Sequence, residues 1–312
     1  MREDAMLTLS SEAFKRASDY VMGNARELER SLIMDRFVSP CDEDVLRALS
    51  KYQNKDGGFG NALEPDFRLP LSSPMSTSKA FEIIKAHDGP TMAQPMIISG
   101  IRYLENTYND DRKGWYAVPK EVNDYPHASW WSYDEKTSMT VIDNSWGNPS
   151  ADIIGVLYTY REHVNFLDIN SLVSYAIDYL KKKESFSSQH ETYCFINLQK
   201  SLPERLSKSL DGPLTRAVSE QVCYDVARWA GYEPRPLDFV NSPDARHYGI
   251  PNERIDENLD YLVRALECND HISPHWDTSD YVGGLRVAIN EWKGNLTLRA
   301  LVALDSFSRI EK

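Results

Sequence analysis

The feature that most constrains the fold of this chain is the segment at residues 52–60, which reads YQNKDGGFG. It follows an apolar pattern at helical spacing and precedes a polar loop, residues 61–73, which leads into another helical pattern. A glutamine, a pair of glycines and an aromatic residue at this spacing form a structural clasp more readily than a catalytic set. We therefore predict structural roles for Gln53 and Phe59, in a unit that recurs along the chain.

Helix-starting signals dominate the rest of the sequence. Ser39 and Pro40 precede the acidic residues 42–44, an order that favours a helix N-terminus. Residues 148–149 (NP) start a second helix by the same reasoning, and Asn295 can cap a third over residues 296–304. Alternation typical of strands is scarce. The sequence therefore predicts an all-α protein, and because no low-complexity linker divides it, a single domain over residues 1–312.

Weak copies of the first unit predict a repeat architecture. Tyr-Leu pairs at residues 103–104, 179–180 and 261–262 each lie near the end of an amphipathic helical pattern, and polar, aromatic loops follow them. Mostly apolar helices are expected to begin near Ser76, Asn148, Glu191 and Asn295. Units of about 40 to 50 residues match a helical hairpin with one long loop. Roughly six such hairpins, each with an outer amphipathic and an inner apolar helix, would close into a double ring.

These units resemble a known repeat. Residues 48–59, with Gln53, Gly57, Gly58 and Phe59, resemble the QW repeat of terpenoid cyclases and protein prenyltransferase β subunits. Residues 102–115, which contain RYL and later GW, resemble a degenerate copy that lacks the glutamine. The resemblance covers most of the chain as weak repeats. It implies an α/α toroid with inner helices around a central cavity.

The catalytic motifs of that superfamily are not found in the sequence. The strings nearest to Asp-x-Asp-Asp are residues 109–111 (NDD) and 42–44 (DED), which are typical of a turn and of the first turn of a helix. Residues 269–277 imitate a class I magnesium motif, but Pro274 would break the helix that this motif needs. At residues 223–225 the zinc-binding order Asp-x-Cys is reversed. We therefore expect no metal ion and no cofactor.

Loops rich in acids and aromatic residues are the candidate site. We expect them to meet at one mouth of the toroid, because each precedes an expected inner helix. The candidate catalytic carboxylates are Glu64, Asp66, Asp143 and Glu291. The candidate ligand-binding residues are Arg68, Trp130, Trp131, Trp146, His190, Trp276, Asp277 and Trp292. Aromatic faces stabilise carbocations, and paired carboxylates beside aromatic rings also suit sugar hydrolysis.

Three functions fit these residues. The first is a terpenoid-cyclase-like or prenyltransferase-like protein that binds or cyclises an isoprenoid-type small molecule in an aromatic and acidic cavity, with Asp66 or Asp143 as proton donor. The second is a carbohydrate-active hydrolase or lyase that uses two of the carboxylates. The third is a binding or scaffold protein that keeps the fold without catalysis. Whether the chain is an enzyme stays open between them.

The amino-acid composition disfavours several classes of binding partner. The chain has 35 Lys and Arg against 47 Asp and Glu, a net charge of −12, which disfavours nucleic acid and anionic lipid. No apolar run approaches the roughly 20 residues that span a bilayer. Residues 1–4 (MRED) lack the character of a signal peptide, and the four cysteines are scattered. We expect a cytoplasmic protein with a small-molecule ligand and no integral membrane segment, and the sequence sets no oligomeric state.

Overall fold

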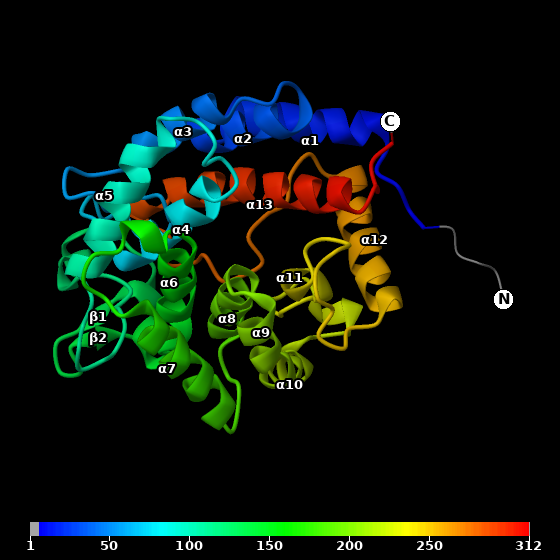
Figure 1. Cartoon of the computed structure of the whole chain (residues 1–312). Helices are drawn as coiled ribbons and strands as arrows, with labels where there is room; N and C mark the ends of the chain where they lie inside the picture. The colour runs from blue at the N-terminus through cyan, green and yellow to red at the C-terminus, as the bar shows by residue number, and fades with distance from the viewer. Residues whose placement is uncertain (1–5, 312) are drawn as a thin grey trace. The chain divides into compact units, whose positions relative to one another are not determined.

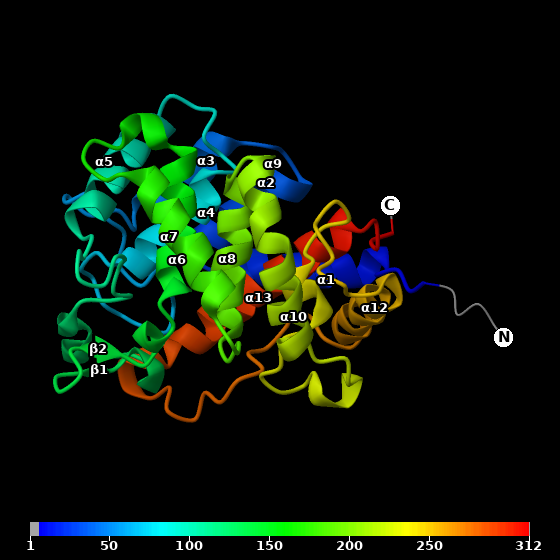
Figure 2. The same cartoon turned by 60° about the horizontal axis from the view of Figure 1, so that its bottom comes forward.

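Helices make up most of the computed structural model, which describes residues 6–311 (Figures 1 and 2). The expectation of an all-α protein is confirmed, with one short antiparallel sheet in addition, β1 (Tyr133–Asp134) and β2 (Met139–Thr140). The sequence argument about a signal peptide rests on residues 1–4, outside the described range. Among the described residues, no helix combines the length and the apolar character needed to cross a bilayer.

The chain divides into two compact units, which we describe separately. Unit 1 contains the described residues up to Cys41, Val218–Ser279, and the residues from Arg286 onward. Unit 2 contains Asp42–Ala217 and the short segment Asp280–Leu285. The single-domain expectation for residues 1–312 stays a prediction.

Unit 1 is built around one long helix. Its helices are α1 (Ser11–Asn24), α2 (Glu27–Phe37), α11 (Pro236–Phe239), α12 (Asn252–Cys268) and α13 (Val287–Ser306). Helix α10 (Asp211–Gln221) begins in unit 2 and ends in unit 1. Helix α13 packs against α1, α2 and α12. The approach is close at Gly294, where an added Cβ would lie 2.5 Å from the Cβ of Ala25.

The predicted helix start at Asn295 is wrong. Helix α13 begins at Val287 and continues through Asn295 to Ser306, so Glu291 and Trp292 lie on a helix and not in a loop. The preference of asparagine for the N-cap is a weak local tendency. The residues before Asn295 also allow a helix, and Gly294 is tolerated there because it lets α13 pack closely against Ala25.

Unit 2 alternates buried and amphipathic helices. Its helices are α3 (Asp42–Ser50), α4 (Pro74–Ile84), α5 (Ala93–Asn106), α6 (Gly147–Thr159), α7 (Ile169–Lys182), α8 (Gln189–Ser201) and α9 (Glu204–Ser207). Helix α6 packs against both α4 and α8, while α5 packs on α4 and α7 packs on α6. Helix α6 is buried along almost its whole length, whereas α7 buries one face only. Buried and one-sided helices therefore alternate at α6 and α7.

The segment at residues 52–60 ties helices α4 and α5 together. The side-chain nitrogen of Gln53 donates hydrogen bonds to Ser99 Oγ (3.0 Å) and to the carbonyl of Met96 (3.3 Å), both on α5. Phe59 is 0% exposed, and its backbone N–H donates to Thr77 Oγ1 on α4 (3.0 Å). The structural roles predicted for Gln53 and Phe59 are therefore confirmed.

The second copy of the unit repeats this connection. The backbone N–H of Trp115 donates to Ser150 Oγ on α6 (2.9 Å), and its indole N–H donates to the carbonyl of Leu104 on α5 (2.7 Å). Thr77 and Ser150 each lie three residues after the first residue of their helix. The repeat thus consists of a fully buried aromatic residue that fixes the first turn of the next buried helix.

Candidate functional site

Asp66 is a buried carboxylate held by two aromatic donors. Its side chain is 4% exposed. The indole N–H of Trp131 donates to Oδ1 (3.0 Å), and the hydroxyl of Tyr281 donates to Oδ2 (3.1 Å). The backbone carbonyl of Asp66 accepts a hydrogen bond from Ala128 N (2.8 Å), which fixes the loop. All of these residues belong to unit 2.

The environment of Asp66 moves its pKa toward neutrality. Burial is the largest cause, and the charge of Glu64 adds to it; together they raise the pKa of Asp66 from 3.8 to about 7. The hydrogen bonds from Trp131 and Tyr281 act in the opposite direction, because they stabilise the charged form. Asp66 can therefore gain and lose a proton near neutral pH, which is what general acid–base catalysis requires.

Tyr281 reaches Asp66 from a distant part of the sequence. It lies in the segment Asp280–Leu285, which also contains the 3₁₀ helix Gly283–Leu285. Its ring lies 6.2 Å from that of Trp130, and the carboxylate of Asp280 accepts a hydrogen bond from Ser129 N (3.3 Å). The segment is thus anchored to the loop that carries Trp131.

A second charged group lies on helix α4. Lys79 and Glu82 form an ion pair of 2.7 Å, and their side chains remain 40% and 41% exposed. Burial acts to lower the pKa of Lys79, but Glu82, and then Glu64, outweigh burial and raise it. The pair is therefore partly exposed, although burial still acts on the pKa of Lys79.

Asp152 on α6 belongs to the same group. It is buried, and the hydroxyl of Ser78 donates a hydrogen bond to it. Burial, and then the charge of Glu82, raise the pKa of Asp152, while Lys85 and Lys79 counteract them. Glu64 acts electrostatically on both Asp66 and Lys79, which links the two parts of the site. We call this set the charged cluster: Glu64, Asp66, Lys79, Glu82 and Asp152.

Asp143 has the contacts of a structural residue. Its Oδ1 accepts a hydrogen bond from Ala117 N (2.7 Å), and its Oδ2 accepts from the backbone N–H and the hydroxyl of Thr140 (2.8 and 2.7 Å). Its backbone carbonyl accepts from the guanidinium of Arg112 (2.7 Å). These bonds fix the loop after β2, so the side chain offers little to a substrate.

The other candidate residues of unit 2 have mixed surroundings. Trp146 is buried, donates to the carbonyl of Arg112 (3.1 Å) and packs against Tyr179 with ring centroids 4.7 Å apart. The guanidinium of Arg68 donates to the carbonyl of Pro65 (3.1 Å), next to Asp66. His190 lies at the exposed start of α8. Of these three, Arg68 is the one adjoining Asp66.

The remaining candidates belong to unit 1. Trp276 and Trp292 contact each other edge to face, with centroids 5.1 Å apart. Asp277 is exposed and accepts a hydrogen bond from Ser279 N (2.8 Å). Glu291 lies on α13, next to Trp292. The convergence of all the candidate residues at one mouth stays a prediction.

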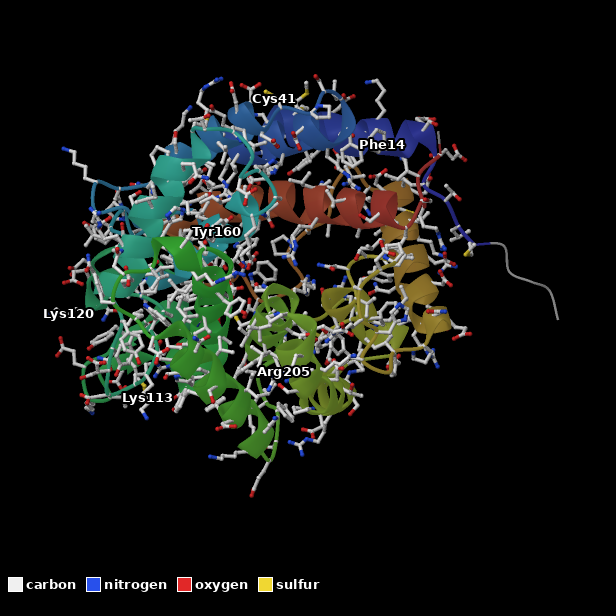
Figure 3. The ribbon with its side chains drawn as sticks, viewed as in Figure 1. Phe14, Cys41, Lys113, Lys120, Tyr160 and Arg205 are labelled. Carbon is white, nitrogen blue, oxygen red and sulfur yellow. The ribbon has the colours of Figure 1, made fainter. Side chains whose placement is uncertain are left out.

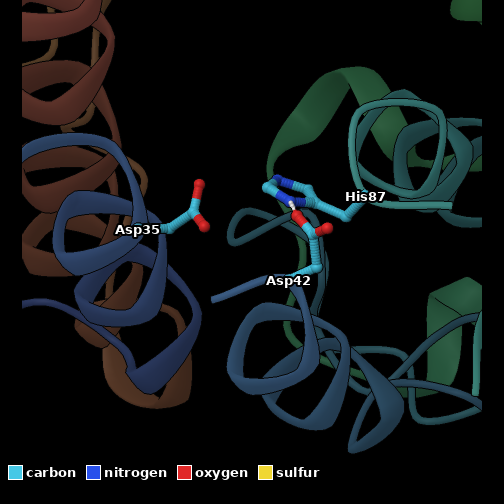
Figure 4. Close-up of side chains that lie close together, drawn as sticks. All are labelled: Asp35, Asp42 and His87. Carbon is cyan, nitrogen blue, oxygen red and sulfur yellow. Dashed lines mark hydrogen bonds and ion pairs between the residues drawn. The ribbon is translucent and has the colours of Figure 1, made fainter. Parts of the chain in front are cut away.

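Two further features of unit 2 lie apart from Asp66. Asp42 Oδ1 lies 2.8 Å from Nδ1 of the buried His87, a contact between the start of α3 and the end of α4 (Figure 4). A surface hollow of about 460 Å³ is lined by Tyr175 and Asp178 of helix α7 and by Lys113. Figure 3 labels Lys113. Lys113 and Tyr175 form a cation–π contact of 5.2 Å.

The sequence does not indicate several residues of the charged cluster or several of the side chains that bind it. Nothing in the sequence pattern pairs Tyr281 with Asp66, which it contacts in the structure. Lys79 and Ser78 occur in a helix start, and Asp152 occurs in an apolar helical pattern. The one available signal was the charged residue within that apolar pattern, because a buried charge needs a partner.

Comparisons with known proteins leave the family open. No family model, no curated protein and no solved structure matches the chain.

Proposed function

We propose that the chain is a carboxylate-dependent enzyme that acts on a hydrophilic, carbohydrate-type small molecule. Asp66 is the general acid or base, and Glu64 is the second carboxylate. The observation that carries this proposal is the buried Asp66 carboxyl, held by Trp131 and Tyr281 with a pKa of about 7. A carboxyl with an ordinary pKa near 4 would hold almost no proton at neutral pH.

The two carboxylates have different roles in this proposal. Asp66 holds its proton because it is buried and because Glu64 carries negative charge nearby. In hydrolysis, Asp66 gives its proton to the leaving oxygen as the glycosidic bond breaks. Glu64 accepts a proton from the water whose oxygen forms the new bond to the anomeric carbon. Paired groups whose environments separate their pKa values are the usual basis for such a division of roles.

The surroundings favour a polar substrate. The charged cluster includes Lys79, Glu82 and Asp152. Contact between these charges and a hydrocarbon would cost free energy. The hydroxyl groups of a sugar can hydrogen bond to such groups, and its C–H faces can pack on rings such as Trp131.

Isoprenoid binding or cyclisation is the second candidate function. The rings near Asp66 favour it, since Phe67 and Trp131 lie 4.6 Å apart and aromatic faces stabilise carbocations. It ranks second because a carboxyl with a pKa near 7 is a weak acid for protonating an alkene. A binding protein without catalysis is the outcome if no substrate is turned over.

We also propose that the helical hairpins form an α/α toroid of the terpenoid-cyclase type. The alternation of α4, α6 and α8 with α5 and α7 in unit 2 supports this arrangement. The repeated connections at Phe59 and Trp115 support it as well. An experimental structure in which the hairpins do not close into a ring would rule it out.

The test of the enzyme is turnover. Purified protein is assayed at pH 7 against a panel of 4-nitrophenyl glycosides and of oligosaccharides, with release of nitrophenol or of reducing ends as the readout. For any substrate found, we expect Asp66→Asn to lower kcat by about 100-fold or more, the scale of a lost general acid. Glu64→Gln should lower kcat similarly.

Asp19→Asn is the matched control, because Asp19 is exposed and pairs with Lys15 on the surface of α1. It should leave kcat unchanged. Full activity of Asp66→Asn would contradict the role of Asp66, and turnover of isoprenoid diphosphates in place of glycosides would favour the second candidate.

A further inference from the structure

Unit 1 contains a chain of aromatic rings that is separate from Asp66. Tyr232 lies 5.8 Å from His275 and 6.2 Å from Trp276, measured between ring centroids. His275 lies 5.3 Å from Trp276, and Trp276 lies 5.1 Å from Trp292 on α13. Tyr232 is 50% exposed and the other rings are partly exposed, so ring faces remain open to solvent.

Cationic groups lie beside these rings. Arg299 follows Trp292 by seven residues on α13, a spacing that places both on the same face of the helix. Burial, and then the positive charges of Arg235 and Arg299, lower the pKa of His275 to about 4. His275 is therefore neutral at pH 7, and the charge near the rings comes from the two arginines.

Hydrogen-bond donors in this group lack partners. Within residues 6–311, the buried indole N–H of Trp292 and the buried Nε of Arg235 make no hydrogen bond. Over the same residues, Arg299 is exposed and makes no hydrogen bond or ion pair. A buried donor without a partner costs free energy, whereas the exposed guanidinium of Arg299 is accessible to a ligand.

The acidic groups nearby are already engaged. The carboxylate of Asp238 accepts a hydrogen bond from Arg235 N (2.7 Å), and Asp277 accepts from Ser279 N (2.8 Å). The rings, Arg235 and Arg299 together form what we call the aromatic–arginine cluster: Tyr232, His275, Trp276, Trp292, Arg235 and Arg299. It offers ring faces and donors in excess of acceptors.

We propose that the aromatic–arginine cluster binds a carboxylated sugar ring. The C–H face of a pyranose packs on Trp276 or Tyr232, as aromatic rings offer apolar area with a polar edge. The carboxylate pairs with the planar guanidinium of Arg299, which matches its geometry. An isoprenoid chain has no carboxylate to pair with Arg299.

Binding of a monosaccharide tests this site without reference to turnover. Glucuronate is titrated into the full chain at low ionic strength, with isothermal calorimetry and intrinsic tryptophan fluorescence as readouts. We expect saturable binding, and at least tenfold weaker binding of glucose, which lacks the carboxylate. Equal affinity for both sugars would overturn the part of the proposal that concerns the carboxylate, and no binding of glucuronate would overturn all of it.

Matched variants assign the binding to the cluster. Arg299→Gln should remove the preference for glucuronate, whereas Arg264→Gln, on the exposed side of α12, should keep it. Trp276→Ala should weaken the binding of both sugars, and Trp276→Phe should restore part of the lost affinity. This inference does not depend on the chemistry of Asp66. Binding that survives both Arg299→Gln and Trp276→Ala would place the sugar elsewhere.

Discussion

At the scale of single residues, Asp66 links burial to the pH dependence of stability. Its pKa is about 7 in the folded chain against an ordinary 3.8, so the folded chain keeps a proton that the unfolded chain loses. The free energy of unfolding should therefore fall as pH rises from about 4 to about 7. Three pKa units correspond to about 4 kcal/mol at most. Urea denaturation at several pH values measures this fall.

The variant Asp66→Asn should flatten that dependence, because it removes the titrating group and keeps an acceptor for Trp131. Asp277→Asn should leave the wild-type slope in place. A wild-type slope that matches that of Asp66→Asn across this range would show that the carboxyl titrates normally.

Tyr281 should tune the same carboxyl. Its hydroxyl stabilises the ionised form of Asp66, so Tyr281→Phe removes a cause that lowers the pKa. We expect the pH at which stability falls to move upward in this variant. Nuclear magnetic resonance of the labelled Asp66 carboxyl carbon gives the pKa directly. An unchanged or lower pKa would mean that the hydrogen bond does not form in solution.

The sequence could identify Asp66 but not its partners. An acid beside aromatic residues is visible in the pattern, whereas the contact with Tyr281 joins residues 215 apart in sequence. Asp143 illustrates the opposite problem. It looks like a catalytic acid in the sequence, but its side chain is bound to backbone N–H groups, which carry no signature in the side-chain pattern.

At the scale of helices and loops, the clasp residues should contribute strongly to stability. Phe59→Ala and Trp115→Ala each remove a fully buried ring and should lower the free energy of unfolding by about 3 to 5 kcal/mol. Chemical denaturation measures the loss. Phe166→Ala is the control, because Phe166 is 65% exposed and should change stability by about 0.5 kcal/mol or less. Equal losses of unfolding free energy in all three variants would show that the buried rings of Phe59 and Trp115 do not stabilise the fold more than an exposed ring does.

Ser73 and Asn295 allow a comparison between an N-cap residue and a residue inside a helix. Ser73 accepts a hydrogen bond from Ser76 N (3.0 Å) as the N-cap of α4, so Ser73→Ala should cost about 1 kcal/mol. Asn295 lies inside α13, where alanine is the better helix former, so Asn295→Ala should be neutral or slightly stabilising. A loss of about 1 kcal/mol of unfolding free energy in Asn295→Ala would indicate that Asn295 does act as a helix cap.

Proline marks one of the helix starts that the sequence predicts. Helix α6 begins at Gly147, close to the start predicted at residues 148–149, because proline fits the first turn and does not fit later turns. Helix α4 begins at Pro74, two residues before the start expected near Ser76. Asn295 has no such constraint, since asparagine is permitted inside helices as well as at their ends. The repeat was readable for a related reason: glycines beside a buried aromatic ring tolerate few replacements.

At the scale of the whole molecule, the two ends of the described chain meet within unit 1. The backbone N–H of Leu9 donates to the carbonyl of Arg309 (2.8 Å), and Glu311 N donates back to the carbonyl of Leu9 (2.9 Å). The buried guanidinium of Arg309 pairs with Asp256 (3.2 Å) and Asp260 on α12, and also donates to the carbonyl of Leu7. One residue therefore connects three segments.

We expect Arg309→Ala to lower the free energy of unfolding by about 1.5 to 3 kcal/mol, because it removes a buried guanidinium that binds the carbonyl of Leu7 and two partly exposed carboxylates. Thermal and urea denaturation measure the loss. Arg264→Ala, at an exposed ion pair on α12, should change the free energy of unfolding by less than about 1 kcal/mol. Wild-type stability in Arg309→Ala would show that the ends are held by other contacts.

The contact between Asp66 and Tyr281 can form only late in synthesis, because Tyr281 lies in the segment Asp280–Leu285, far along the sequence. The ribosome releases the Asp66 loop and Trp131 early, but it releases Tyr281 only after most of the chain has been made. Domains generally fold as they emerge. A nascent or truncated chain that ends before residue 280 can therefore contain folded helices and still lack one of the two donors to Asp66. The hydrogen bond from Tyr281 to Asp66 would then form only after residue 281 has been synthesised.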